Sequence, residues 1–290
     1  AAAEPTGVRE PPHAITHLND PVQPMWGKAV SVQWRNEGFP VQGWLLFPPH
    51  FDPHQHYPMI VYVHGGPSWA TLPSWPRDGY GPVPLAAMGY FVLMPNPRGS
   101  FGEGERFAQA VRLNMGYGDL RDILAGVDRV EALYPVDDSR LGLTGWSYGG
   151  FMSMFAPTQT HRFKAAVVGA GLSDWKSYYG ENSIDEWMIP FFGASVYEDP
   201  QAYARSWAIN FIRNDKTPAL IVVGEYDGEC PAPQSFEYWH ALRAMGVATR
   251  LVVYAGEGHG FVKPADERDV LERALRWFGK YLGTGPAGAL

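Results

Sequence analysis

Ser147 stands in a context that could make it a nucleophile. The stretch Leu141–Gly150 contains Gly145-Trp146-Ser147-Tyr148-Gly149, the Gly-x-Ser-x-Gly pattern of a nucleophile elbow, in which a strand turns sharply into a helix. Small residues on both sides of the serine let the backbone turn without a clash. The turn presents the hydroxyl and directs the N–H of Tyr148 toward the place where an oxyanion forms. Chance matches are common in a chain with 33 glycines, but the apolar stretches before and after this one favour an elbow.

A serine hydroxyl is a weak nucleophile at neutral pH and needs a positioned base. In an α/β-hydrolase the serine is followed by the acid and then by the histidine, each on a loop after a strand. Three histidines follow Ser147. His161 lies too close to the end of the elbow helix, and His240 lies within a helical pattern. We predict His259 as the base, because it stands among glycines directly after the last predicted strand.

The acid is expected on the loop after the preceding strand, residues 219–223. Glu225, Asp227 and Glu229 all lie on that loop. Asp227 is favoured because it lies far enough past the strand to reach the histidine loop, where it would hold the tautomer of His259 and stabilise the imidazolium. Glu229 is expected to contact the substrate near the scissile carbonyl.

A second oxyanion donor is expected on the loop after the third strand. That loop reads His64-Gly65-Gly66-Pro67, and we assign the role to the N–H of Gly65, beside the N–H of Tyr148. His64 precedes the serine, so it does not fit the order expected of the base. Its side chain is expected to line the oxyanion site.

Alternating strand and helix patterns surround these residues. They predict an α/β-hydrolase fold, with a mostly parallel central sheet and helices on both faces. The stretch 175–203 is aromatic and irregular, and we expect it over the carboxyl ends of the strands, where ligands bind. The predicted elements are an edge hairpin (29–34 and 41–47), strands at 59–63, 91–94, 141–144, 165–168, 219–223 and 251–254, and helices near 120–130, 151–155, 233–245 and 267–282.

Bulk properties narrow the range of functions. The net charge of −7 and the lack of a basic cluster argue against nucleic acid as a partner. No apolar run reaches the roughly 18 residues of a membrane span. Cys230 is the single cysteine, which favours a cytoplasmic protein, with an exported protein whose signal has been removed as the alternative. We expect no cofactor and no metal, because the histidines near residue 54 have no carboxylate or cysteine at ligand spacing.

Taken together, the motifs resemble the catalytic domain of the prolyl oligopeptidase family of serine peptidases, and within it the acylaminoacyl-peptidase and dipeptidyl-peptidase IV branches. The resemblance covers about residues 25–285 and implies Ser147, Asp227 and His259 as the triad. Relatives carry a β-propeller before this domain. We therefore divide the chain into residues 1–25, an extended arm or propeller remnant, and residues 26–290, the catalytic domain. The matching motifs are His64-Gly65-Gly66-Pro67, Asn96-Pro97-Arg98-Gly99-Ser100, Gly145-Trp146-Ser147-Tyr148-Gly149-Gly150, Gly224-Glu225-Tyr226-Asp227 with Cys230-Pro231, and Gly258-His259-Gly260.

The resemblance also implies a specificity pocket for proline or another compact apolar side chain. For Leu172 and Trp175, packing in the core is the alternative. In dipeptidyl-peptidase IV relatives a tyrosine hydroxyl helps to bind the oxyanion, and His64 occupies that position here. The implied lining consists of Tyr148, Leu172, Trp175, Tyr178, Tyr179, Asn182 and Cys230, with His64 and Glu229 beside it.

The sequence thus predicts a serine hydrolase working through an acyl-enzyme, a peptidase that cleaves short peptides or acyl-amino acids and also hydrolyses esters. The alternatives are a stand-alone carboxylesterase acting on small acyl esters and, from another class, a non-catalytic binding domain on the same fold. The expected partner is a small peptide or ester, with neither nucleic acid nor membrane. A homo-oligomer is compatible with the sequence.

Overall fold

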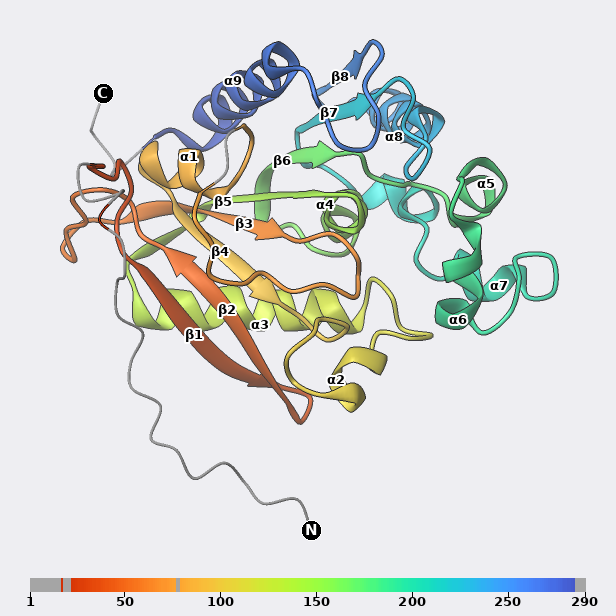
Figure 1. Ribbon diagram of the computed structural model, residues 1–290, viewed down its shortest axis with the longest axis horizontal. Helices are drawn as coiled ribbons and strands as arrows, with labels where there is room; N and C mark the ends of the chain where they lie inside the picture. Colours follow the sequence, from red (N-terminus) through yellow and green to blue (C-terminus); the bar gives the residue numbers. More distant parts are fainter. Residues whose placement is uncertain (1–16, 18–21, 77–78, 285–290) are drawn as a thin grey trace.

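The computed structural model describes residues 17, 22–76 and 79–284, and in them an eight-stranded sheet organises the chain (Figure 1). The strand order is β1-β2-β4-β3-β5-β6-β7-β8. The pairs β1–β2 and β2–β4 are antiparallel, and all the others are parallel. The strands are β1 Ala29–Asn36, β2 Phe39–Leu46, β3 Tyr57–Val63, β4 Phe91–Asn96, β5 Val136–Trp146, β6 Phe163–Gly169, β7 Ala219–Gly224 and β8 Thr249–Tyr254.

The predicted edge hairpin is confirmed. Asn36 pairs with Phe39 across a two-residue turn. Both turn residues have positive φ, 47° at Glu37 and 83° at Gly38, as the tight turns that match the strand twist require. The two strands run a few residues closer to this turn than the alternating pattern alone indicated.

Helices cover both faces of the sheet. Consecutive residues of β6 and β7 point to opposite faces and are buried on each, as in a parallel sheet between two helical layers. One layer contains α3 (Gly118–Leu133), α4 (Tyr148–Gln159) and α8 (Ala232–Ala244). The other contains α1 (Pro82–Ala87) and α9 (Pro264–Leu282), with α9 and α3 on opposite sides of the sheet in Figure 1. The predicted fold class is confirmed.

The aromatic stretch forms a group of short helices beyond the end of β6. Figure 1 shows α5, α6 and α7 gathered at the side toward which β3 and β6 point. Their aromatic side chains pack on one another and on α4. The predicted placement over the carboxyl ends of the strands is therefore correct. The elements are α5 Trp175–Glu181, a 3-10 turn Asp185–Trp187, α6 Met188–Phe192, α7 Pro200–Ala204 and a second 3-10 turn Ala208–Asn214.

Besides the short helices of the aromatic stretch, which was predicted as irregular, two more short helices were not foreseen, α1 and α2 (Glu105–Gln109). Both are too short to give a helical period in the sequence. Most of the arm predicted over residues 1–25 lies outside the described residues. Within the part that is described, no helix is long and apolar enough to cross a membrane.

Candidate active site

Ser147 sits on a strained turn between β5 and α4. Its φ and ψ are 61° and −121°, a conformation that costs a non-glycine residue energy and persists only where the surroundings enforce it. The flanking glycines explain how it is enforced. A Cβ at Gly145 would lie 2.4 Å from the carbonyl oxygen of Val63, and one at Gly149 would lie 2.1 Å from the same oxygen. Only glycine fits at either position, so the geometry is that of the predicted elbow.

The predicted acid and base lie together. His259 Nδ1 is 2.9 Å from Asp227 Oδ2 and 3.1 Å from Oδ1. Asp227 Oδ1 also accepts the N–H of Glu229 at 2.9 Å and that of Cys230 at 2.7 Å. The Asp227 side chain has no solvent exposure, whereas that of His259 is 19% exposed. A carboxylate only accepts hydrogen bonds, so Nδ1 carries the proton and Nε2 is free to take one.

The charge around the imidazole favours its protonated form. Burial acts against that form, but the hydrogen bond and charge of Asp227, with the charge of Glu229, outweigh it and raise the pKa of His259. Its Nε2 lies 3.7 Å from Glu229 Oε2. The base is therefore flanked by two carboxylates, and Asp227 is the one that holds its Nδ1.

Glu225, which also competed for the acid role, joins the loop of the acid to the loop of the base. Its Oε2 accepts the N–H of Gly256 at 2.9 Å. Nearby, the N–H of Tyr226 donates to the carbonyl of Glu257 at 2.8 Å. The buried Glu257 carboxylate in turn accepts the N–H groups of Val262 at 2.9 Å and Lys263 at 3.0 Å. The acid and base loops thus form one hydrogen-bonded unit.

A separate bond joins the base loop to the elbow. Trp146 Nε1, next to the serine, donates to the carbonyl of His259 at 2.8 Å. Ser147 Oγ lies 3.9 Å from Cys230 Sγ, and among the described residues no hydrogen bond joins it to His259. Such catalytic hydrogen bonds are often long before substrate binds. The three residues predicted as the triad thus lie in one region, with the serine hydroxyl turned toward Cys230.

The loop after β3 approaches the serine through its glycines. A Cβ at Gly65 would lie 3.3 Å from Ser147 Cβ, and Gly66 lines the cavity beside the serine. His64 is placed differently from the prediction. Its Nδ1 donates to the carbonyl of Gly65 at 2.6 Å, so its Nε2 accepts the hydroxyl of Ser100 at 2.9 Å. Burial lowers the pKa of His64, and its neutral ring anchors the loop.

Tyr148 contributes its backbone to the site while its side chain is fixed elsewhere. The N–H of Tyr148 belongs to the first turn of α4, where backbone donors lack helical partners. The phenol donates to Asp119 Oδ2 at 2.6 Å. Burial raises the pKa of Asp119 to about 6, although the bonds from Tyr148 and from backbone N–H groups act in the opposite direction. This buried pair fixes the residue that follows the nucleophile.

A cavity of about 290 Å³ opens beside the serine. It contains several of the predicted pocket residues, and Trp175, Tyr179 and Asn182 are absent from its lining. Trp175 packs in the core and donates to Ser206 Oγ, and Tyr179 packs on Tyr203. Asn182 holds a turn by bonds to Tyr178 O and the N–H of Ile184. The cavity is lined by Gly66, Ser147, Tyr148, Leu172, Tyr178, Ile184, Trp187, Glu229 and Cys230.

The sequence did not identify Gly66, Ile184 and Trp187 as lining residues. Ile184 and Trp187 lie in the stretch predicted to cover the site, but nothing in their spacing shows which aromatic or aliphatic residues face inward. Ser183 explains the placement, because its N–H and hydroxyl both donate to the carbonyl of Gly228, at 2.7 and 2.8 Å. This pair of bonds ties the outer wall of the pocket to the loop of the acid.

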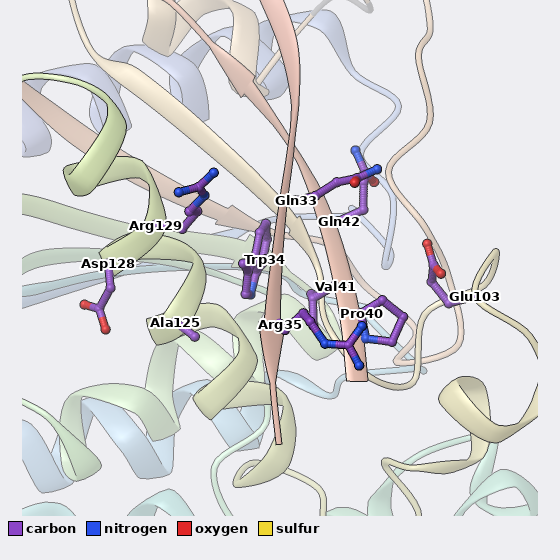
Figure 2. Close-up of a pocket in the computed structure, with 10 residues that line it drawn as sticks. All are labelled: Gln33, Trp34, Arg35, Pro40, Val41, Gln42, Glu103, Ala125, Asp128 and Arg129. Atoms are coloured by element: carbon purple, nitrogen blue, oxygen red, sulfur yellow. The ribbon is translucent and has the colours of Figure 1, made fainter. Parts of the chain in front are cut away.

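A larger hollow of about 890 Å³ lies away from this chemistry, between the edge hairpin and α3 (Figure 2). Its lining contains Arg35 and Arg129 as well as Glu103 and Asp128, so the opposite charges balance and the hollow favours neither an anionic nor a cationic ligand. It contains none of the triad residues. Across the described parts of the chain, no three His, Cys, Asp or Glu side chains group so that they could hold a metal ion.

Comparisons with known proteins agree with this geometry. The sequence profile of the prolyl oligopeptidase family matches residues 78–285. An uncharacterized peptidase of Bacillus subtilis, YuxL, is 35% identical over 87% of this chain and 39% of its own length. The acylamino-acid-releasing enzyme of Sus scrofa is 30% identical over 85% of this chain and 34% of its own. An acylaminoacyl peptidase structure from Pyrococcus horikoshii superposes with a TM-score of 0.83 and 26% identity, over 93% of this chain and 45% of that one. The chain thus spans about a third to two fifths of the length of these two curated relatives.

Proposed function

This chain belongs to the prolyl oligopeptidase family of serine peptidases, and we propose that it cleaves short peptides or acyl-amino acids through an acyl-enzyme on Ser147, with accompanying hydrolysis of esters. The observation that carries the proposal is the strained elbow serine beside the buried Asp227–His259 pair. Strained backbone at a non-glycine residue is concentrated at functional sites, and the φ of 61° and ψ of −121° at Ser147 are such a strained conformation. A non-catalytic binding domain would not need this arrangement.

In the proposed reaction, His259 Nε2 takes the proton of Ser147 as the hydroxyl attacks the scissile carbonyl. The serine turns away from Cys230 to meet the imidazole. Backbone N–H groups of Tyr148 and of the glycine loop, where Gly65 is the assigned donor, stabilise the oxyanion. His259 then protonates the leaving amine, and the acyl group stays on Ser147. Water attacks this ester with the same histidine as base and regenerates the enzyme.

The pocket supports a compact apolar group beside the scissile carbonyl. Leu172, Tyr178 and Ile184 give it apolar walls, and its volume of about 290 Å³ is at the lower end for small-molecule sites. Shape discrimination in such a pocket is worth about 1–3 kcal/mol for each misfitted methylene. The names of the relatives favour amide bonds over esters as the natural substrate.

The test combines labelling with turnover. A fluorophosphonate probe is expected to label the wild type and not Ser147→Ala. The wild type is then assayed on alanyl- and N-acetylalanyl-p-nitroanilides and on the matching p-nitrophenyl esters. Cleavage of both classes, lost in Ser147→Ala, is the expected result. Cleavage of the esters alone would favour the carboxylesterase alternative. If the wild type showed no labelling and no turnover, the proposal would be refuted.

A further inference from the structure

Glu229 places a carboxylate at a pocket whose other walls are largely apolar. The other lining residues are glycine, serine, cysteine, aliphatic or aromatic, so Glu229 is the one charged side chain among the described residues that line the cavity. Its carboxylate is half exposed at the rim. Among the described residues no lysine or arginine forms an ion pair with it, and its ion-pair contact is with His259 Nε2 at 3.7 Å.

The position of Glu229 is fixed relative to the catalytic residues. Its backbone N–H donates to Asp227 Oδ1 at 2.9 Å, so the turn that orients the triad acid also sets where the Glu229 side chain begins. Its carboxylate stands beside the nitrogen that must reach Ser147 Oγ during catalysis. The carboxylate is therefore close to the carbonyl under attack.

The ionisable substrate group closest to that carbonyl is the α-amine of the same residue. It is separated from the carbonyl carbon by one Cα, which places the two atoms about 2.5 Å apart. A free α-amine is protonated below about pH 7.7, so it would meet Glu229 as a cation. A blocked nitrogen is neutral, and a succinyl group adds a negative charge that Glu229 would repel.

We propose that Glu229 binds the protonated α-amino group of the substrate residue that donates the acyl group. The site then prefers aminoacyl amides and esters with a free amine over the same compounds with a blocked amine. This inference rests on the proposed function and names the substrate class within it. A mere effect of Glu229 on the base is a distinct alternative, because stabilising the imidazolium would change turnover of all substrates alike.

The experiment compares three substrates that differ at the amine alone: alanyl-, N-acetylalanyl- and N-succinylalanyl-p-nitroanilide, at pH 6.5 and low salt. The variant is Glu229→Gln, which keeps the shape and removes the charge. The matched control is Glu186→Gln, an exposed glutamate of the 3-10 turn Asp185–Trp187 that lies next to the lining residue Trp187 but does not itself line the cavity. The readout is the ratio of kcat/KM for the free amine to that for the blocked one.

A charged hydrogen bond of this kind corresponds to about a tenfold preference or more. In Glu229→Gln we expect the free-to-acetyl ratio of kcat/KM to fall about tenfold and kcat/KM for the succinyl substrate to rise. In Glu186→Gln we expect the free-to-acetyl and free-to-succinyl ratios to stay unchanged. Equal loss on all three substrates, or an unchanged ratio, would overturn the inference.

Binding to Ser147→Ala separates this inference from the proposed function. Calorimetry would measure the affinity of the alanyl and N-acetylalanyl anilides for Ser147→Ala and for the double variant with Glu229→Gln. A preference for the free amine that disappears with the Glu229 charge supports the inference even if turnover is absent. Equal affinities of the two ligands for Ser147→Ala refute it, whatever the outcome of the activity assays.

Discussion

Replacing Asp227 by asparagine should invert the tautomer of the base. Asp227 Oδ1 accepts two backbone N–H groups, from Glu229 and Cys230. An amide nitrogen cannot accept them, so the asparagine oxygen must take the Oδ1 position. The NH₂ group then faces His259 Nδ1 in place of Oδ2, 2.9 Å away. Two donors cannot face each other, so Nδ1 must become the acceptor and the proton moves to Nε2, where it blocks the base.

The expected loss is large, since wrong-tautomer variants of such triads lose about 10⁴-fold in kcat, roughly 5.5 kcal/mol. The fold should survive, because both backbone bonds to the side chain are kept. The assay is kcat on an activated p-nitrophenyl ester, with the circular dichroism melting temperature as the check on folding.

Glu225→Gln is the matched control for Asp227→Asn. Its amide oxygen can still accept the N–H of Gly256, so we expect activity within a few-fold of the wild type. If Asp227→Asn retained more than a few per cent of the rate, or Glu225→Gln were the more damaged variant, the assignment of the acid and the tautomer argument would both be wrong.

Four further outcomes can be measured. The value of kcat/KM should rise with pH, with the midpoint of this rise above the ordinary histidine pKa of about 6.5, because the pKa of His259 is raised and its neutral form is the base. Glu229→Gln should move this midpoint to lower pH, since the charge of Glu229 contributes to the raised pKa of His259. The buried Asp119 has its pKa raised to about 6, so the stability linked to its protonated form should be lost as pH rises from about 4 to 6. Its contribution to the unfolding free energy should fall by up to about 3 kcal/mol over that window, and urea titrations of Asp119→Asn should lack this component. Gly149→Ala should lower the unfolding free energy by about 1–3 kcal/mol or prevent folding, because its Cβ would lie 2.1 Å from Val63 O; unchanged urea stability would contradict the elbow geometry.

The fold and the placement of the candidate triad residues could be predicted because both depend on local signals. Buried parallel strands are continuous apolar runs, and the strand bearing the elbow is followed at once by its glycines. Asp227 and His259 follow strand ends, and in a parallel sheet adjacent strand ends meet at one edge. Both predicted strands, β7 and β8, are neighbours in the sheet. Chain order therefore sufficed to bring the acid and the base together.

The pocket could be predicted only in part, because its lining depends on which way aromatic side chains turn. Trp175 and Trp187 belong to the same insertion, yet Trp175 is buried in the core and Trp187 faces the cavity. The difference comes from tertiary bonds, such as those from Ser183 to Gly228, that have no signature in the sequence. His64 shows the same limit, since its anchoring bond to Ser100 joins residues 36 apart in the chain.

The orientation of the Ser147 hydroxyl toward Cys230 has a consequence for the time course of the reaction. Turning it to His259 is a rotation about one side-chain bond, which in accessible residues takes picoseconds to nanoseconds. Peptidase turnover typically takes milliseconds to about a second, so the rotation cannot be the slow step. Its effect is instead one of occupancy, because only the fraction of molecules with the aligned rotamer can react at any instant. A substrate that fills the space beside Cys230 would raise that fraction, and the enzyme would then be faster on tight-fitting acyl groups for reasons that their affinity alone would not reveal.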